Sequence, residues 1–353
     1  MTASLMNKPR VTEKILEHFR RVAANGGSIG CIPRGIVLNY DYRCNFSCQH
    51  CFAGSPQLRN APPTSPLSLD ELKNVFDQAN DLGIYEVDIQ GGEPLLYPDL
   101  MGIIAAIGSD RFYIYVTSNG YLLDESKARQ LAQAGITRVT VSVDGLDEDE
   151  NDTFRGMKGA YRRAWEALEH IRQAGMQPTI NFTVTRENVL APELDELCGI
   201  AREKKYHIAF NCATPTGCWQ GKTNVMITAQ GRDRLQRLRE KYPGMLIRDL
   251  WNVSDRKQKR VCGCPSVNLC YINPAGDVLP CPYLHIKLGN IREQPLADIL
   301  EFGFGIRHFR EHSDVCLAGE NKGFVEEFLS FPGMSIRNPL PARDVFPEKD
   351  FLS

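Results

Sequence analysis

Short apolar stretches alternate with amphipathic stretches between about residues 35 and 212. The apolar stretches are rich in Val, Ile, Thr, Phe and Tyr, which favour buried strands. The amphipathic stretches repeat apolar residues at helical spacing. We therefore expect six strands, at residues 35–40, 85–90, 112–118, 137–144, 178–185 and 207–212.

One helix is expected before the first strand and others between the strands. The helix at 68–83 has clear end signals, because Ser68 and Glu71 have the spacing of a capping box and Gly83 can end the helix. Repeated strand–helix units predict a parallel sheet covered by helices, with ligand contacts at the carboxyl ends of the strands. The pattern leaves open whether the sheet is doubly wound or a partial barrel. The expected helices are at residues 11–24, 68–83, 98–107, 124–134, 160–174 and 191–204.

The alternation stops after about residue 222. A helix is expected at 229–241, and a tight hairpin turn at Asn273–Gly276. Further helical sequence lies at 295–309 and 324–329, before a Pro-rich end. We divide the chain into a helical extension, a β/α core, a linker helix region, a small cysteine-rich module and a tail, at 1–33, 34–222, 223–259, 260–320 and 321–353.

Composition narrows the class of protein. The chain has 353 residues with 41 Lys and Arg against 43 Asp and Glu, so the charge balance gives no reason to expect nucleic-acid binding. No apolar run approaches the length of a membrane span, and the N-terminus lacks the apolar core of a secretory signal. We expect a cytoplasmic protein with no membrane partner. In such a chain, twelve cysteines indicate metal binding or catalysis more than disulfides.

Three of the cysteines directly follow the first strand, in the sequence CNFSCQHC. Cys44, Cys48 and Cys51 can hold three irons of a [4Fe–4S] cube and leave the fourth iron open to a ligand. Zinc is the alternative, but it normally needs a fourth Cys or His nearby. His50 is a strained choice for that ligand, since it lies between two of the cysteines.

Polar residues and glycines follow the next strands. Glycines let a ligand approach the backbone, and a carboxylate can accept hydrogen bonds from an ammonium group. Each group is also compatible with an ordinary turn or a solvated surface position. The candidate cofactor-binding residues among them are Gly91, Gly92, Glu93, Ser118, Asn119, Ser142 and Asp144.

The cysteine spacing resembles the CxxxCxxC signature of radical S-adenosylmethionine (SAM) enzymes, and the order of the later motifs agrees with it. The resemblance covers about residues 34–215 and implies a partial (β/α)6 TIM barrel. It implies that Glu93 binds the amino group of SAM, Arg155 its carboxylate and Ser142 its ribose or carboxylate. His50 stands where the family usually has Tyr or Phe beside the adenine, which is a departure.

The second group of cysteines resembles the opening of SPASM and twitch domains, small hairpin-plus-helix domains that hold auxiliary clusters. The resemblance implies one auxiliary [4Fe–4S] cluster, because the later cysteine run of a full SPASM domain is absent. Cys262 also fits the spacing and can replace Cys264 or Cys270. A four-cysteine zinc ribbon is the alternative. The expected ligands are Cys264, Cys270, Cys281 and Cys316.

These features imply an enzyme that cleaves SAM to a 5′-deoxyadenosyl radical and abstracts hydrogen from a small polar substrate. Alcohol dehydrogenation of a sugar-like or aminocyclitol-like intermediate is the expected reaction, with the auxiliary cluster as electron acceptor. An external donor such as flavodoxin or ferredoxin is expected. Epimerisation with Cys212 or Cys218 as hydrogen donor, and peptide modification, are alternatives. The alternative to an enzyme is a non-catalytic protein, either an iron–sulfur electron carrier or a zinc-binding scaffold.

Overall fold

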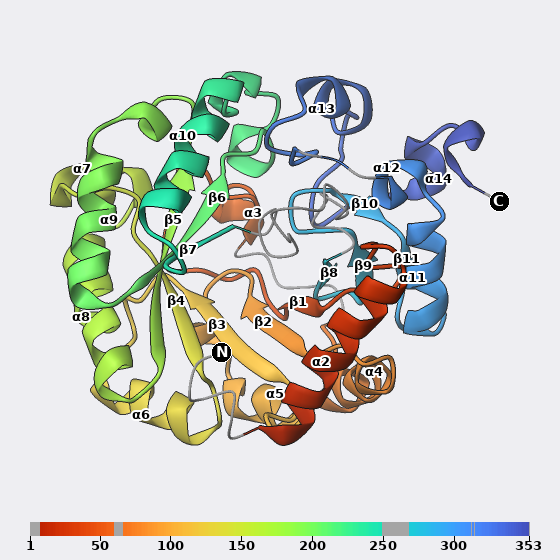
Figure 1. Cartoon of the computed structure of the whole chain (residues 1–353), viewed down its shortest axis with the longest axis horizontal. Coiled ribbons are helices and arrows are strands. Elements are labelled where there is room, and N and C mark those ends of the chain that lie inside the picture. Colours follow the sequence, from red (N-terminus) through yellow and green to blue (C-terminus); the bar gives the residue numbers. More distant parts are fainter. Residues whose placement is uncertain (1–7, 60–65, 249–267, 312, 314, 353) are drawn as a thin grey trace.

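The computed structural model describes residues 8–59, 66–248, 268–311, 313 and 315–352. Six parallel strands form the centre, and helices cover their outer face (Figure 1). The six central strands are β1 (Gly35–Asn39), β2 (Glu86–Gln90), β3 (Tyr113–Ser118), β4 (Arg138–Ser142), β5 (Gln177–Val184) and β6 (His207–Cys212). The other described strands are β7 (Leu246–Ile247), β8 (Leu269–Ile272), β9 (Asp277–Leu279), β10 (Ile286–Lys287), β11 (Gly289–Asn290) and β12 (Leu340–Pro341).

The helices agree closely with the expected ones. The Ser68–Glu71 capping box is formed, with Glu71 N donating to Ser68 Oγ at 3.2 Å and Ser68 N to Glu71 Oε2 at 2.8 Å. The helix at 148–155 was not expected, because its acidic sequence has little apolar periodicity. The helices are α2 (Pro9–Ala24), α3 (Pro56–Arg59), α4 (Leu69–Asp81), α5 (Leu100–Ile107), α6 (Glu125–Gln133), α7 (Glu148–Arg155), α8 (Ala160–Gln173), α9 (Glu193–Lys204), α10 (Ala229–Lys241), α11 (Leu296–Phe304), α12 (Arg307–Arg310), α13 (Lys322–Phe328) and α14 (Ala342–Val345).

The order of the strands identifies the sheet as a partial barrel. It runs β11-β9-β8-β1-β2-β3-β4-β5-β6-β7 and does not close among the described residues. The apolar side chains of α4, α5, α6, α8 and α9 pack on the outer face of β1–β6 and form the main core. This confirms the expected β/α barrel rather than the doubly wound alternative.

The C-terminal hairpin extends this same sheet. β8 pairs in parallel with β1, with Cys270 opposite Ile36 and Tyr271 opposite Val37. The turn before β9 forms as expected, with Gly276 at φ +85° and its N–H donating to Asn273 O at 3.0 Å. The sheet is therefore continuous between residues 34–222 and the described part of 260–320.

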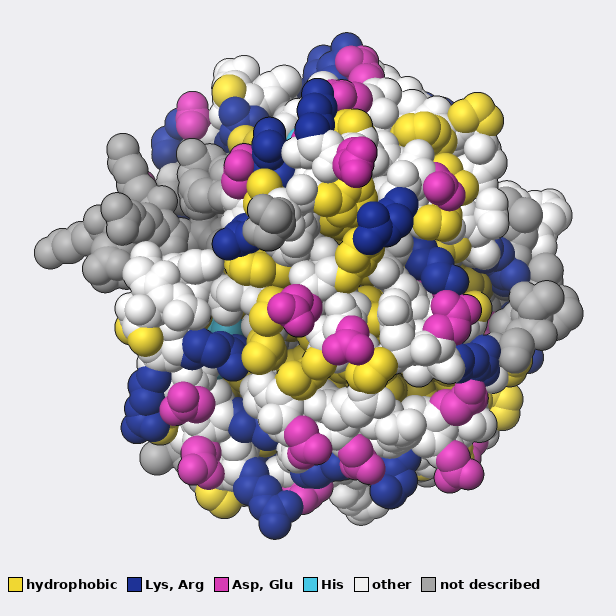
Figure 2. All heavy atoms as spheres, turned by 90° about the vertical axis from the view of Figure 1, so that its right-hand side faces the viewer, with side chains coloured by type: hydrophobic (Ala, Val, Ile, Leu, Met, Phe, Trp, Pro, Cys, Tyr) yellow, Lys and Arg dark blue, Asp and Glu magenta, His cyan; other side chains and the backbone are white. Residues whose placement is uncertain are grey.

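The outer surface carries charges of both signs. On the face that includes α11 and α14, acidic and basic side chains are interspersed with small apolar patches (Figure 2). None of the described helices is both long and apolar enough to cross a bilayer.

Three glycines bring the loops after other elements against the segment that follows β1. A Cβ atom at Gly92 would collide with the carbonyl oxygens of Tyr42 and Arg43, and one at Gly217 with the carbonyl of Cys51. Gly156 ends α7 at φ +62° and meets Ser47 in the same way. The backbone of residues 42–52 is therefore held from three sides.

We expect Gly92→Ala to lower the free energy of unfolding by about 2 kcal/mol, because an added methyl group has no space between backbone atoms. Gly199→Ala is the control, since a Cβ at that helical position meets nothing within 4 Å. Alanine should leave stability there unchanged or raise it by up to about 1 kcal/mol. Anaerobic urea unfolding followed by circular dichroism measures both. Equal stabilities of the two variants would contradict the packing argument.

Candidate functional site

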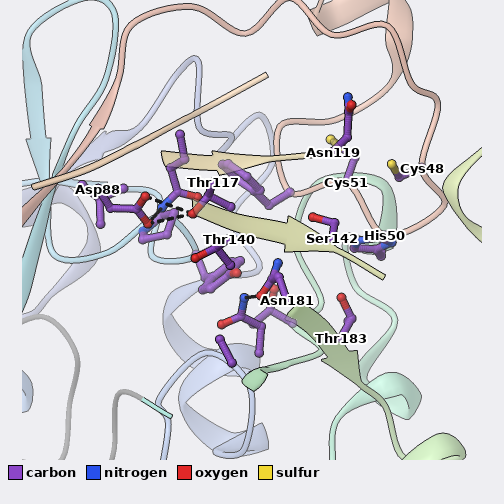
Figure 3. Close-up of a pocket in the computed structure, with 18 of the residues that line it drawn as sticks. Cys48, His50, Cys51, Asp88, Thr117, Asn119, Thr140, Ser142, Asn181 and Thr183 are labelled. Atoms are coloured by element: carbon purple, nitrogen blue, oxygen red, sulfur yellow. Dashed lines mark hydrogen bonds between the residues drawn. The ribbon is translucent and has the colours of Figure 1, made fainter. Parts of the chain in front are cut away.

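A cavity of about 260 Å³ extends from the loop after β1 into the interior of the barrel. Cys44, Cys48 and Cys51 line one end of it. Polar side chains of β2–β6 line much of the rest, together with aromatic and aliphatic ones such as Phe210 and Trp219. Figure 3 shows the polar side chains following one another from Asp88 to the cysteines. The cysteines of the sequence motif therefore face the carboxyl ends of the strands, where a parallel sheet places its ligand contacts.

The cysteine loop is ordered by short-range hydrogen bonds. Phe46 N donates to Cys44 Sγ at 3.4 Å, and Cys51 N donates to Cys48 O at 3.3 Å. Asn119 Nδ2 lies 3.9 Å from Cys44 Sγ and donates to Asn45 Oδ1 at 2.8 Å. Asn119 thus lies where it was expected, at the cysteine end of the cavity, and braces the loop.

The donor set of this loop, three cysteine thiols, suits a [4Fe–4S] cluster with one open iron. A structural zinc ion normally takes four Cys or His ligands. A zinc site needs its ligand atoms within about 2.0–2.3 Å of one centre. In a [4Fe–4S] cluster each thiolate binds a different iron, so the ligands stand further apart.

His50 lines the cavity beside the cysteines, and its ring stacks on Phe154 with centroids 4.6 Å apart. Burial lowers the pKa of His50 to about 4, so the ring is neutral near pH 7. Its Nδ1 is buried and has no hydrogen-bond partner among the described residues. The ring therefore has one unsatisfied polar atom, Nδ1, while its Nε2 lies 3.8 Å from Asp144 Oδ2.

Arg155 and Asp144 form a buried ion pair at this end of the cavity. Arg155 Nη1 donates to Asp144 Oδ2 at 2.6 Å, and Thr183 N donates to Asp144 Oδ1 at 2.7 Å. Burial, the largest single effect, raises the pKa of Asp144, but the charges of Arg155 and His50 and the hydrogen bonds from Arg155 and Thr183 together lower it, so the net shift is downward. Arg155 lines the cavity and its Nε has no partner in the described chain, whereas Asp144 does not line it. Asp144 is therefore placed to orient Arg155 rather than to touch a ligand.

The Glu93 side chain does not lie where a contact with the amino group of SAM would place it. The carboxylate is fully buried and does not line the cavity. It accepts hydrogen bonds from Ser118 Oγ at 2.7 Å, Asn119 N at 2.8 Å and Leu95 N at 3.1 Å. Burial raises its pKa. The side chain ties the loop after β2 to the end of β3, while the neighbouring Gly91 and Gly92 expose backbone to the cavity.

Ser118 and Ser142 line the cavity as expected, but a longer polar series was missed. Thr117 Oγ1 donates to Asp88 Oδ1 at 3.0 Å, and Asn211 Nδ2 donates to Asn181 Oδ1 at 2.5 Å. The signal was present in the sequence, because polar residues occupy alternate positions of otherwise apolar strands. The members of this series are Asp88, Thr117, Thr140, Thr179, Asn181, Thr183 and Asn211.

The cysteines expected to bind the auxiliary cluster do not all lie at the cavity. Cys281 and Cys316 line the same cavity as the first three cysteines. Cys270 does not line it: the side chain is 1% exposed and packs in the main core on the helix side of the sheet. The expectation that Cys270 is a ligand is therefore not supported, because strand alternation turns it away from the cavity. Cys262 and Cys264 lie outside the described residues.

Of the two expected hydrogen donors, Cys212 lines the cavity and Cys218 does not. The backbone of Cys218 instead packs on the cysteine loop, with its N–H donating to Cys51 O at 2.9 Å. Cys198 is fully buried in α9, and burial raises its pKa to about 12, as expected for an unreactive core thiol.

Comparisons with known proteins agree with this geometry. The radical SAM superfamily model matches residues 38–198, and an iron–sulfur cluster-binding domain model, SPASM, matches residues 262–318. An AdoMet-dependent heme synthase from Methanosarcina barkeri is 29% identical over 80% of this chain and 86% of its own length. A PqqA peptide cyclase from Granulibacter bethesdensis is 26% identical over 76% of this chain and 73% of its own.

The fold also matches solved structures. Streptococcus suis SuiB bound to S-adenosylmethionine aligns with a TM-score of 0.60 and 19% identity, over 80% of this chain and 68% of that one. The two domains imply a [4Fe–4S] cluster, an auxiliary cluster and SAM as cofactors. The chain thus contains a radical SAM domain, at residues 38–198, and a C-terminal SPASM iron–sulfur cluster-binding domain, at residues 262–318.

Proposed function

We propose that the enzyme uses SAM to abstract a hydrogen atom from a small polar substrate and completes a two-electron oxidation. The observation that carries the proposal is the shared cavity. Cysteines from both cluster regions and the polar series of β2–β6 line a single space. A substrate held there lies between the site where SAM is cleaved and the site that accepts an electron.

Cys44, Cys48 and Cys51 are the proposed ligands of the SAM-binding cluster. When bound, this cluster supplies the electron that cleaves SAM to methionine and a 5′-deoxyadenosyl radical. The loop is held by backbone contacts at Gly92, Gly156 and Gly217, so its position does not depend on the cluster alone.

The polar groups beside the cysteines are proposed to orient SAM. Arg155, fixed by Asp144, offers an unpaired buried Nε to the carboxylate. The exposed backbone at Gly91 and Gly92 is proposed to receive the amino group, a role first expected for the Glu93 side chain. Ser142 is proposed to contact the ribose. His50 offers an aromatic face and an unpaired Nδ1 to the adenine.

The polar series is proposed to bind the substrate. Its members carry hydroxyl and amide groups, with one carboxylate at Asp88. These groups suit a substrate with several hydroxyl or amino groups, such as a sugar or an aminocyclitol, and dehydrogenation of an alcohol is the reaction we favour. A flavodoxin or ferredoxin is the proposed electron source.

Peptide modification and epimerisation remain the competing proposals. The relatives named above include a peptide cyclase, and SuiB has also been solved bound to its precursor peptide. A hydrogen-donor thiol would favour epimerisation, and Cys212 is the one of the two expected donors that lines the cavity. Solvent deuterium at the reacting carbon would indicate epimerisation, whereas an oxidised product without it would indicate dehydrogenation.

After anaerobic reconstitution we expect about eight irons per chain, from two four-iron clusters, and 5′-deoxyadenosine when SAM and dithionite are added. Cys48→Ala should reduce iron to about four and abolish 5′-deoxyadenosine. Cys281→Ala should also lose about four irons but keep more SAM cleavage. Iron assay and liquid chromatography measure these outcomes. About four irons in the unmodified enzyme would remove the auxiliary cluster, and bound zinc without SAM cleavage would refute the enzyme proposal.

We expect Arg155→Met to weaken SAM binding by about 10- to 100-fold, because a charge-assisted hydrogen bond contributes about 1.5–3 kcal/mol. Iron content should stay unchanged. The double variant Arg155→Met/Asp144→Asn controls for the buried charge left on Asp144. Arg163→Met removes an arginine whose side chain is 54% exposed and should not affect binding. Anaerobic equilibrium dialysis with labelled SAM measures the affinities, and unchanged affinity in both Arg155 variants would disprove the carboxylate contact.

A further inference from the structure

The expected auxiliary cysteines among the described residues do not all reach the cavity. Cys281 and Cys316 line the cavity, but Cys270 lies opposite Ile36 in the β1–β8 pairing, within the helix-side core. The next residue along β8, Tyr271, packs on the other face with Val37. Bringing Cys270 to the cavity would need a one-residue slip of β8, which would turn each of its side chains to the wrong face.

Another cysteine takes a position beside Cys316. Cys212 ends β6, and the segment after Cys316 packs on it. A Cβ atom built on Gly319 would lie 3.0 Å from Cys212 Cβ and 3.6 Å from Cys316 Sγ. Cys212, Cys281 and Cys316 all line the cavity. Cys212 and Cys316, more than 100 positions apart in the chain, thus lie next to each other in the fold.

A buried ion pair fixes this arrangement. Arg248 Nη2 donates to Cys212 Sγ at 3.2 Å and to Glu320 Oε2 at 2.5 Å. The same carboxylate oxygen accepts from Cys316 N at 2.7 Å. The Arg248 and Glu320 side chains are 8% and 0% exposed. A guanidinium held against a sulfur suits the negative charge of a metal-bound thiolate better than it suits a neutral thiol.

The position of the Cys212 side chain on β6 argues against a role as hydrogen donor. In the β5–β6 pairing, Asn211 lies opposite Thr183, and both side chains belong to the polar series of the barrel interior. Cys212 lies opposite Val184, which packs in the helix-side core. Cys212 therefore lines the cavity at its rim, at the end of β6 and next to Cys316, rather than within the polar series.

We propose that Cys212 is a ligand of the auxiliary cluster, together with Cys281 and Cys316, so that the last strand of the six-stranded barrel contributes directly to the SPASM cluster. This rests on the auxiliary cluster of the proposed function. The barrel and the C-terminal domain would then share one inorganic centre.

The test uses the full chain in a Cys44→Ala/Cys48→Ala/Cys51→Ala background, which leaves only the auxiliary cluster. We expect this background to bind about four irons after anaerobic reconstitution. Adding Cys212→Ala should remove at least half of that iron or change the electron paramagnetic resonance spectrum of the reduced cluster. Adding Cys270→Ala, the matched control, should change neither.

Unchanged iron and an unchanged spectrum after Cys212→Ala would overturn the proposal, as would cluster loss on Cys270→Ala alone. Cys212→Ser, which keeps the side-chain size, and urea unfolding of the apo variants separate ligand loss from misfolding. A Cys212→Ser variant that folds and retains the original cluster also overturns the proposal. A background that binds no iron would instead refute the auxiliary cluster itself, and with it the ligand role of Cys212.

Discussion

Side chains alternate between the two faces of every strand, and this constraint decides which residues of the sheet reach the cavity. Along β5 it presents Thr179, Asn181 and Thr183 to the barrel interior and gives the intervening apolar side chains to the helices. The same rule buries Cys270 in the core. A polar reaction space and an apolar core are therefore built from the same short strands.

Two buried ion pairs fix positive charge near the cysteines. Arg155 is held by Asp144 near the first group, and Arg248 by Glu320 near the second. Each carboxylate also accepts a backbone N–H, from Thr183 and Cys316 respectively. The pairs thus tie loops from different elements together while they orient a guanidinium. Such buried pairs stabilise little by themselves, but losing one partner leaves a costly unpaired charge.

The sequence was sufficient for the six barrel strands, for the helices between them apart from α7, and for the placement of Cys44, Cys48 and Cys51, because periodicity and close spacing are local properties. It was insufficient where strand pairing between distant parts of the chain decides whether a side chain points to the cavity or to the core. Glu93 was expected to contact SAM, yet Ser118 and Asn119 satisfy its carboxylate. Cys270 fitted a ligand spacing, but its pairing with β1 turns it toward the helix-side core and away from the cavity. Only the folded sheet brings Cys212 beside Cys316.

The pairing of β1 with β8 also constrains the order in which the molecule can assemble. β1 ends at residue 39 and its second neighbour begins at residue 269. During synthesis, β1 therefore keeps one open edge until most of the chain has left the ribosome. Contacts of such large sequence separation form late and slowly. The cysteine loop, which directly follows β1, reaches its final surroundings only when the C-terminal hairpin docks.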